Sequence, residues 1–448
     1  MKRRSRFTAL AAVLGLALIA SACSNNNNNS GASGASGSSG SSGATGAAVD
    51  CTTAPGCVTV ASGAPIEIGT LLATTGPNKN LGLDSLYGVE LAIDYLDGSF
   101  DGTNGQIDGH DVKLVNESDG CSADGGQKGE TPLGADPQIV GVIGTSCSSA
   151  SLGVADKFFS DKGIVIISPS ATNPALTTEG THQPYFFRTA HNDRIQAAVD
   201  ADFAVQKLKA KTAVTIHDES PYTQGLTDGF KANFEALGGS VTDEEAVNSA
   251  DTDFKALLTK IAQNPPDVLY APDFNPVCAY IGQQARDISA LDKTIIIGAD
   301  GCADPTYTSI GGTAVNGNYL SGPDLTAFSG GDFYTSQFLP AYKSLVGSTP
   351  ISVFHAHAFD AFNILAKAIE ASAVQNSDGS LTIQRVALKD AVVATNGYQG
   401  IIGTLTCTPL GDCATSVTIG VYQVPNVGFL DPTAKPVFSE TKTLADVA

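Results

Sequence analysis

The chain has 448 residues and carries 45 acidic against 25 basic side chains, a formal net charge of −20 at pH 7. This excess of dispersed negative charge disfavours nucleic-acid binding, because phosphates attract basic proteins, and it indicates a well-solvated surface. The length is long for a single domain and suits two.

The N-terminus has the layout of a secretory signal peptide. Residues 1–6 carry four basic side chains, an apolar run follows over residues 9–20, and small residues precede Cys23. The run is about a dozen residues, whereas a bilayer-spanning helix needs about 20, so we expect removal of residues 1–22 rather than the alternative, a permanent transmembrane anchor. The stretch 20–23 resembles the bacterial lipobox, although Ala20 stands where leucine is commonest. This resemblance implies lipidation at Cys23.

The segment after Cys23 is predicted to be a flexible tether. Residues 24–48 consist of Asn, Ser, Gly, Ala and Thr only. Such a segment cannot bury enough surface to offset its ordering entropy, and about 25 coil residues span roughly 25–30 Å. We therefore assign residues 23–62 to the lipidated cysteine and its tether, which hold the folded part at the outer face of the cytoplasmic membrane.

Eight of the nine cysteines remain once Cys23 is set aside, and an even number in an exported chain predicts disulfides. Spacing alone does not determine their connectivity. Zinc is the alternative, but no CxxC motif occurs and the six histidines are scattered, so we expect no metal site. Taken in chain order, the expected pairs are Cys51 with Cys57, Cys121 with Cys147, Cys278 with Cys302, and Cys407 with Cys413.

From residue 66 onward, short apolar strands alternate with amphipathic helices in two series. The first series has predicted strands at 66–72, 111–116, 139–144 and 164–167. The second begins near Arg194 and has predicted strands at 212–217, 268–271 and 294–297, followed by one at 315–320. Strands that alternate with helices of ten to fifteen residues predict parallel α/β sheets. Two series predict two lobes.

Hydroxyl-rich loops follow two of the buried strands. Residues 145–149 follow the strand 139–144, and residues 168–172 follow the strand 164–167. Ligands of open parallel sheets bind at the carboxyl ends of the strands, where hydroxyls and helix N-terminal N–H groups suit a carboxylate. The alternative is helix capping without a ligand.

Three residues of the second series are candidates for the opposite wall of such a site. Asp300 lies in the turn after strand 294–297 and presents a carboxylate that suits an ammonium group; the alternative is an ordinary turn or cap aspartate. Tyr222 and Phe274 are positioned to wall a ligand's side chain, with a core aromatic as the alternative.

Three longer stretches resemble the leucine/isoleucine/valine-binding proteins, the branched-chain amino-acid class of periplasmic-binding-protein receptors that serve ABC importers. They are ISPSATNPALT at 167–177, PYFFRTA at 184–190 and DTDFKALLTKI at 251–261. The resemblance runs from about residue 66 to residue 424. It implies a type I periplasmic-binding-protein fold, α/β, with two lobes that are each a mostly parallel sheet flanked by helices. Three hinge crossovers are expected near 188–190, 318–322 and 403–407.

The resemblance makes each lobe discontinuous in sequence. The implied boundaries are 63–189 and 319–405 for the first lobe, and 190–318 and 406–448 for the second. Hinge closure around a ligand is the implied mechanism.

The resemblance also implies residue roles. Ser148 and Thr172 would bind an α-carboxylate, and Thr172 with the carbonyl of Ser170 would meet the α-ammonium. Asp300 stands in the place of an acidic residue that also binds the ammonium, and Tyr222 matches a pocket aromatic. The full expected ligand-binding set is Ser148, Ser170, Ala171, Thr172, Tyr222, Asp300, Phe274 and Leu81.

The chain departs from the family where the ligand's side chain would lie. Leu81 stands where some members have an aromatic residue, and Phe274 or Asn275 replaces a tyrosine-rich stretch. The resemblance therefore favours an α-amino acid of branched-chain or aliphatic type without specifying leucine.

The implied function is a monomeric, extracytoplasmic solute-binding lipoprotein that delivers its ligand to an ABC permease and ATPase. The alternatives are a ligand-sensing receptor domain of the same fold, or a binder of urea, short amides or aromatic acids. An enzyme is not expected, because the loop 144–148 is not GxSxG and neither HExxH nor a P-loop motif occurs. No cofactor is expected.

Overall fold

The computed structural model describes residues 50–426 and 434–447. The predicted signal peptide, the lipidation site Cys23 and most of the predicted tether lie outside the described residues. Within the described ranges, no helix is long and apolar enough to cross a membrane.

The first large sheet has six strands in the order β3-β4-β2-β5-β6-β7. All neighbours pair in parallel except β3 with β4. Every residue of β5 is buried, as expected for a central parallel strand covered on both faces. The strand bounds are β3 (Gln106–Ile107), β4 (His110–Glu117), β2 (Ile66–Leu71), β5 (Ile139–Gly144), β6 (Val165–Ser168) and β7 (Phe186–Arg188).

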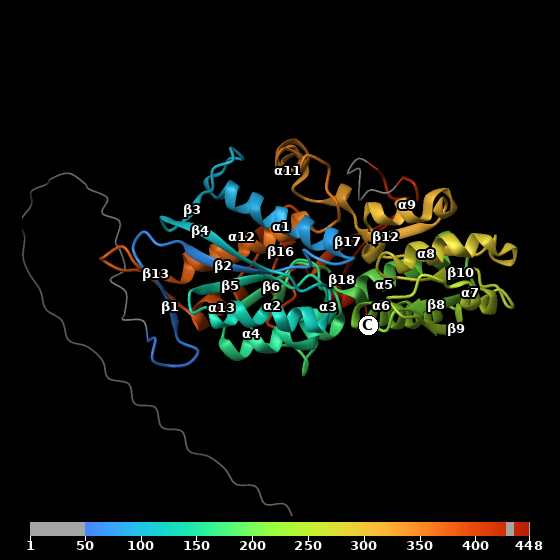
Figure 1. Ribbon diagram of the computed structural model, residues 1–448, viewed down its shortest axis with the longest axis horizontal. Helices are drawn as coiled ribbons and strands as arrows, with labels where there is room; N and C mark the ends of the chain where they lie inside the picture. The colour runs from blue at the N-terminus through green and yellow to red at the C-terminus, as the bar shows by residue number, and fades with distance from the viewer. Residues whose placement is uncertain (1–49, 427–433, 448) are drawn as a thin grey trace, which may run out of the picture. The chain divides into compact units, whose positions relative to one another are not determined.

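Helices cover both faces of this sheet. On one face, Val142 packs in a cluster with Leu133 of α2 and Phe159 of α4. On the other, Val140 packs in a cluster with Leu365 of α12. Figure 1 shows α1 in blue beside α12 in orange, although they come from opposite ends of the folded chain. The bounds are α1 (Lys79–Asp94), α2 (Ala123–Ala135), α4 (Asp156–Lys162), α11 (Leu339–Val346), α12 (His355–Ser372) and α13 (Arg385–Val393).

A buried carboxylate joins α1 to α12. Asp84 accepts hydrogen bonds from the backbone N–H of His355 at 2.8 Å, from its Nδ1 at 2.9 Å, and from the Tyr342 hydroxyl at 2.7 Å. Burial acts to raise the pKa of Asp84, but the charge and hydrogen bonds of His355 outweigh it and the pKa is lowered. Asp84 therefore stays ionised in the folded protein and stabilises the helix pair.

The second large sheet has seven strands in the order β18-β17-β12-β11-β10-β8-β9. The strands from β12 to β9 pair in parallel, and β17 and β18 are added antiparallel at one side. The strand bounds are β18 (Phe438–Thr443), β17 (Ser416–Gln423), β12 (Tyr319–Pro323), β11 (Ile295–Gly298), β10 (Val268–Tyr270), β8 (Thr212–His217) and β9 (Ser240–Ala246). The helices are α5 (Asp193–Asp202), α6 (Pro221–Ala236), α7 (Lys255–Ile261), α8 (Val277–Gln284) and α9 (Pro305–Gly311).

The buried strands match the sequence predictions closely, and the exposed ones were missed. β5 and β8 have the predicted bounds at both ends. β9 carries exposed and half-buried positions in alternation, so its apolar signal is weak. The strand predicted from 315 begins at Tyr319, because residues 312–315 form a 3-10 turn.

The folded chain begins inside the range 23–62 that the sequence assigned to a tether. Cys57–Val60 form β1, which pairs antiparallel with β14 (Leu381–Gln384) in a small sheet that also holds β13 (Ala373–Gln375). Val58 and Val60 point into the core, only 1% and 2% exposed. Their alternation with Thr59 is the strand signal that the tether assignment overlooked.

The four cysteine pairs expected from chain order are all joined as disulfides. Cys121–Cys147 links the segment after β4 to the loop after β5. Cys278–Cys302 links α8 to η7 (Asp300–Cys302), a 3-10 turn after β11. In the part of the chain that the structure describes, no cluster of three or more His, Cys, Asp or Glu side chains is arranged to hold a metal ion.

The chain passes between the two sheets three times. The first passage follows β7, and the second follows β12. Because β12 pairs with β17 as far as Pro323, the second passage lies beyond the expected range 318–322. The third follows β16 (Thr404–Leu405) and precedes β17. Arg188 forms an isolated parallel bridge with Asp412, so the first and third passages lie side by side.

Several buried carboxyl groups have raised pKa values, and burial is the main cause in each. The pKa is about 6 for Asp119 and about 7 for Glu130, Asp156, Asp200 and Asp360. Each group tends to hold a proton in the folded state at a pH where the unfolded chain has released it.

We predict that the free energy of unfolding falls as the pH rises from about 5 to about 8, because the folded state binds more protons than the unfolded state in that window. The stabilisation from Asp84, whose pKa is lowered, is fully present above about pH 4 and is lost only below it. Thermal unfolding midpoints of the ligand-free protein across this range provide the measurement. A midpoint that climbs steadily toward pH 8 would contradict the prediction.

Candidate functional site

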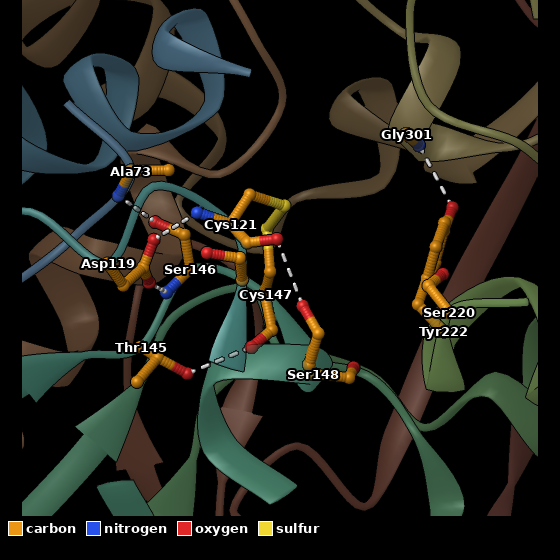
Figure 2. The surroundings of a disulfide bond; sticks show 12 residues. Ala73, Asp119, Cys121, Thr145, Ser146, Cys147, Ser148, Ser220, Tyr222 and Gly301 are labelled. Atoms are coloured by element: carbon orange, nitrogen blue, oxygen red, sulfur yellow. Dashed lines mark hydrogen bonds between the residues drawn. A yellow bond between two sulfur atoms is a disulfide. The ribbon is translucent and has the colours of Figure 1, made fainter. Parts of the chain in front are cut away.

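The loop after β5 is held in place by a buried carboxylate and a disulfide, as Figure 2 shows. Asp119 accepts the backbone N–H of Cys121 at 2.8 Å and that of Ser146 at 2.6 Å. The Cys121–Cys147 disulfide ties the same two segments together. These bonds set the direction of the backbone into α3 (Ser148–Ala150), so Ser148 stands at the carboxyl edge of the sheet.

The loop after β6 is bonded directly to the loop after β5. The Ser170 hydroxyl donates to the Ser146 carbonyl at 2.8 Å, and the Ser148 hydroxyl accepts the backbone N–H of Asn173 at 3.1 Å. Ser148, Ser170 and Thr172 are all buried. The two hydroxyl-rich loops predicted from sequence therefore form one continuous polar wall.

A fully buried arginine positions the second of these loops. The Nη1 of Arg188 donates to the carbonyl oxygens of Ala171 at 3.2 Å and Asn173 at 3.0 Å. Its Nε donates to Asp412 Oδ1 at 2.7 Å. Arg188 thus holds the carbonyls on both sides of Thr172. The orientation of residues 171–173 therefore depends on the Arg188 side chain, which is not itself part of the polar wall.

The opposite wall comes from the second sheet. The Tyr222 hydroxyl accepts the backbone N–H of Gly301 at 3.0 Å and donates to Asp300 Oδ1 at 3.0 Å. The Phe274 ring packs against the Tyr222 ring with centroids 4.7 Å apart. Burial and the nearby charge of Asp300 raise the pKa of Tyr222 well above its usual value, so the phenol keeps its proton and acts as a donor.

Gly301 suits the close approach of this aromatic pair. A Cβ added there would lie 3.0 Å from carbon atoms of both Phe274 and Tyr222. The glycine therefore lets the turn after β11 approach the rings, which brings Asp300 within reach of the Tyr222 hydroxyl.

A small hollow is lined by residues of both lobes. Leu81 of α1 lines it together with Phe274 and Asp300 from the second sheet. The Asn173 side-chain amide donates to the Pro221 carbonyl at 2.5 Å, a contact that joins the two walls directly. Of the residues predicted to bind a ligand, Leu81, Phe274 and Asp300 line this hollow, whereas the hydroxyl-rich loops meet the second lobe at the contact between Asn173 and Pro221.

All eight residues predicted to bind a ligand lie at these facing edges. The first lobe supplies Ser148, Ser170, Ala171, Thr172 and Leu81, and the second supplies Tyr222, Phe274 and Asp300. The Ser170 hydroxyl donates its hydrogen bond to the Ser146 carbonyl. The Ser170 carbonyl, which the resemblance assigns to the ammonium, is therefore oriented by the backbone of the loop and not by the Ser170 side chain. Contact of these residues with a ligand stays a prediction.

Asp193, at the first turn of α5, lies beside the Thr172 loop and was not singled out in the sequence analysis. Its backbone N–H donates to the Thr172 carbonyl at 3.0 Å. The Thr172 hydroxyl lies beside the Asp193 carboxylate, but the two groups do not form a well-aligned hydrogen bond. Both buried groups therefore lack a hydrogen-bond partner among the described residues. Burial and the charge of Asp300 raise the pKa of Asp193 well above its usual value. The sequence feature that could have identified Asp193 is its position, five residues after Arg188 and just beyond the stretch 184–190 that resembles the family.

Comparisons with known proteins point the same way as the geometry. The sequence profile of the periplasmic binding protein family matches residues 65–424. Leu/Ile/Val-binding protein homolog 3 of Brucella melitensis is 28% identical over 362 residues, which cover 79% of this chain and 89% of the relative.

Two solved structures illustrate the structural similarity. The branched-chain amino acid transporter substrate-binding protein LivJ of Streptococcus pneumoniae, in complex with isoleucine, has a TM-score of 0.71 and 24% identity, covering 85% of this chain and 99% of that one. A solute-binding protein of Rhodopseudomonas palustris, in complex with benzoate, has a TM-score of 0.68 and 20% identity, covering 85% and 96%. The structural similarity confirms the predicted fold class, and the family profile together with the Brucella relative confirms the resemblance. The profile describes binding proteins, which also confirms that the chain is not an enzyme.

We predict that Arg188→Lys lowers the free energy of unfolding by about 2–4 kcal/mol and weakens binding of the tightest-bound amino acid roughly tenfold. The three nitrogens of Arg188 donate to Asp412, to Thr177 and to the two carbonyls, and a single lysine nitrogen with three donors cannot reproduce this arrangement. Denaturant unfolding and calorimetric titration provide the two readouts. Arg194→Lys is the matched control, since Arg194 makes one neutral hydrogen bond to Thr178 at 3.2 Å. Equal effects of the two substitutions would show that Arg188 has no special role.

Proposed function

This chain belongs to the periplasmic binding protein family, and on that premise we propose that it binds an α-amino acid between its two lobes and delivers it to an ABC permease and its ATPase. Family membership indicates a location outside the cytoplasm. The observation that carries the proposal is the arrangement of polar groups. The buried hydroxyls of Ser148 and Thr172 belong to one lobe, and the other lobe supplies the buried carboxylates Asp193, beside Thr172, and Asp300, whose charge acts on Asp193.

The hydroxyl wall suits the carboxylate end of a zwitterion. Ser148 and Thr172 offer hydroxyl and backbone N–H donors, and the bond from Asn173 to Ser148 keeps them adjacent. Hydrogen bonds to a charged group contribute roughly 1.5–3 kcal/mol each. Because Asp119 and Arg188 already hold the two loops, little ordering entropy is lost when the ligand binds.

The acidic wall suits the ammonium end. The like charges of Asp193 and Asp300 oppose each other in the ligand-free protein, which is part of the reason that the pKa of Asp193 is raised. An ammonium ion placed between them would neutralise this repulsion and supply donors to the two Asp193 oxygens, which have none. Benzoate, bound by one structural neighbour, lacks an ammonium and would leave these carboxylates unpaired.

One part of the hollow suits an apolar side chain on the ligand, while Asn78, Asp304 and Ser352 make the rest of its lining polar. Leu81 and Phe274 line the apolar part, with the Tyr222 ring packed behind Phe274. An aliphatic or branched-chain amino acid fits this chemistry, and the relative from Brucella is named as a Leu/Ile/Val-binding protein. The second candidate function is a ligand-sensing domain of the same fold. It would use the same contacts and differ in its partner.

Ligand binding would bridge the lobes and close the hinge. The proposed lobes are 63–189 with 319–405 and 190–318 with 406–448, with the adjustment that Tyr319–Pro323 pairs within the second sheet. A ligand that contacts both walls favours the closed state by its differential affinity, and the permease would recognise that state.

The central test is a calorimetric titration of ligand-stripped protein with α-amino acids, urea, acetamide and benzoate. We predict binding of at least one α-amino acid, with affinity roughly tenfold or more weaker in Asp300→Ala and in Asp193→Asn. Asp193→Asn should also raise the unfolding free energy of the empty protein near pH 8, because it removes a buried charge without a partner.

Asp332→Asn, an exposed acid, is the control for this series. Unchanged affinity in Asp300→Ala would remove that residue from the site. Binding of urea or benzoate without any amino acid would overturn the proposed ligand class.

The proposal includes removal of residues 1–22, lipidation of Cys23 and a tether that holds the folded part at the membrane. We predict that Cys23→Ser moves the protein from the membrane fraction to the released fraction, because the acyl chains are the anchor. Fractionation and the mass of the N-terminal peptide provide the measurement, with Ser24→Ala as the matched control. Retention of Cys23→Ser in the membrane fraction would contradict lipid anchoring.

A further inference from the structure

A second pocket, of about 440 Å³, opens on the first lobe. It is lined by α2, by η2 (Ser151–Ala155), a π-helical turn, and by α4, together with residues 181 and 183. It shares no lining residue with the hollow between the lobes. None of its residues has a part in the amino-acid site proposed above.

Two buried carboxylates lie in this pocket. Glu130 of α2 and Asp156 of α4 are each only 3% exposed. Glu130 Oε2 and Asp156 Oδ1 have no hydrogen-bond partner among the described residues. Leaving a buried carboxylate unpaired is costly, and a second one nearby adds repulsion to that cost.

Other buried acids of the same lobe are satisfied by the backbone. Asp360, for example, accepts the N–H groups of Ile401 and Ile402, both at 3.0 Å. That carboxylate has a structural role that explains its burial. The free oxygens of Glu130 and Asp156 have no such role within the fold, so they are available to a ligand from outside.

The two carboxylates are poised to respond to a positive charge. Burial raises the pKa of both groups to about 7. For Asp156 a hydrogen bond from Ser151 and the charge of Arg188 act against the increase, and the charge of Glu130 adds to it. Lys157, the lysine among the lining residues, forms an ion pair with Asp161 at 2.6 Å, and both side chains are exposed to solvent. An entering cation would lower both pKa values and release protons near neutral pH.

The rest of the lining indicates which kind of cation fits. Calcium and magnesium ions take six or more oxygen ligands, and no group of three acidic, histidine or cysteine side chains in the described part of the chain is arranged to hold a metal ion. Leu152, which is 37% exposed, and Phe158 add apolar surface beside the acids. We propose that this pocket binds a primary alkylammonium ion, with its nitrogen between Glu130 and Asp156 and its stem against Leu152 and Phe158.

The test uses calorimetric titration of the purified protein with n-butylammonium and with 1,5-diaminopentane near neutral pH. We expect saturable binding by wild type and by Asp300→Ala alike, and roughly tenfold or greater weakening in the isosteric variants Glu130→Gln and Asp156→Asn. The measured heat should also depend on the ionisation enthalpy of the buffer, because binding releases protons. Thermal midpoints of the two variants at or above that of wild type would show that they are folded.

Three results would overturn the assignment. Absence of saturable amine binding at millimolar concentration removes the site. Binding lost in Asp300→Ala but kept in Glu130→Gln places the amine between the lobes instead. Calcium binding that Glu130→Gln abolishes, without amine binding, makes it a site for a hard cation. Because these outcomes do not depend on whether an amino acid binds between the lobes, they are separate from the test of the proposed function.

Discussion

The buried ion pair between Arg188 and Asp412 is the interaction on which the arrangement of the site depends. It joins the first and third passages between the sheets, where backbone bonds also run from Arg188 N–H to the Gly411 carbonyl and from Cys413 N–H to the Arg188 carbonyl. The same guanidinium holds the loop that carries Thr172. Breaking a buried pair of this kind leaves an uncompensated charge, so the passage between lobes and the polar wall are stabilised together.

Buried acids divide into two kinds according to what satisfies them. Asp84 and Asp119 receive several donors from the protein and hold helices or loops in place. Asp193 and Asp156 have free oxygens and raised pKa values. The second kind destabilises the empty protein at a pH where the acids are ionised. In the two sites that we propose, each of these acids would gain a partner when a cation binds, so part of its cost in folding free energy would be recovered on binding.

Much of the proposed site was predictable because it follows a topological rule. Ser148 and Thr172 come directly after buried parallel strands, and Asp300 comes after another, so each is delivered to the same edge of its sheet. Asp193 and Arg188 were not predicted as functional residues. Asp193 begins a helix rather than following a strand, and the partner of Arg188 lies more than two hundred positions away, so no local pattern marks either residue.

The sequence by itself determined the elements whose burial is complete, such as β5 and β8. It did so because apolar periodicity and turn residues act locally. The cysteine pairs were an expectation from chain order, and the tertiary structure decided them by bringing each pair together. The tertiary structure alone decided that Val58 and Val60 begin the folded chain, since only pairing with β14 buries them. It also decided which carboxylates remain without donors, because the satisfaction of a buried charge depends on groups brought together from distant parts of the chain.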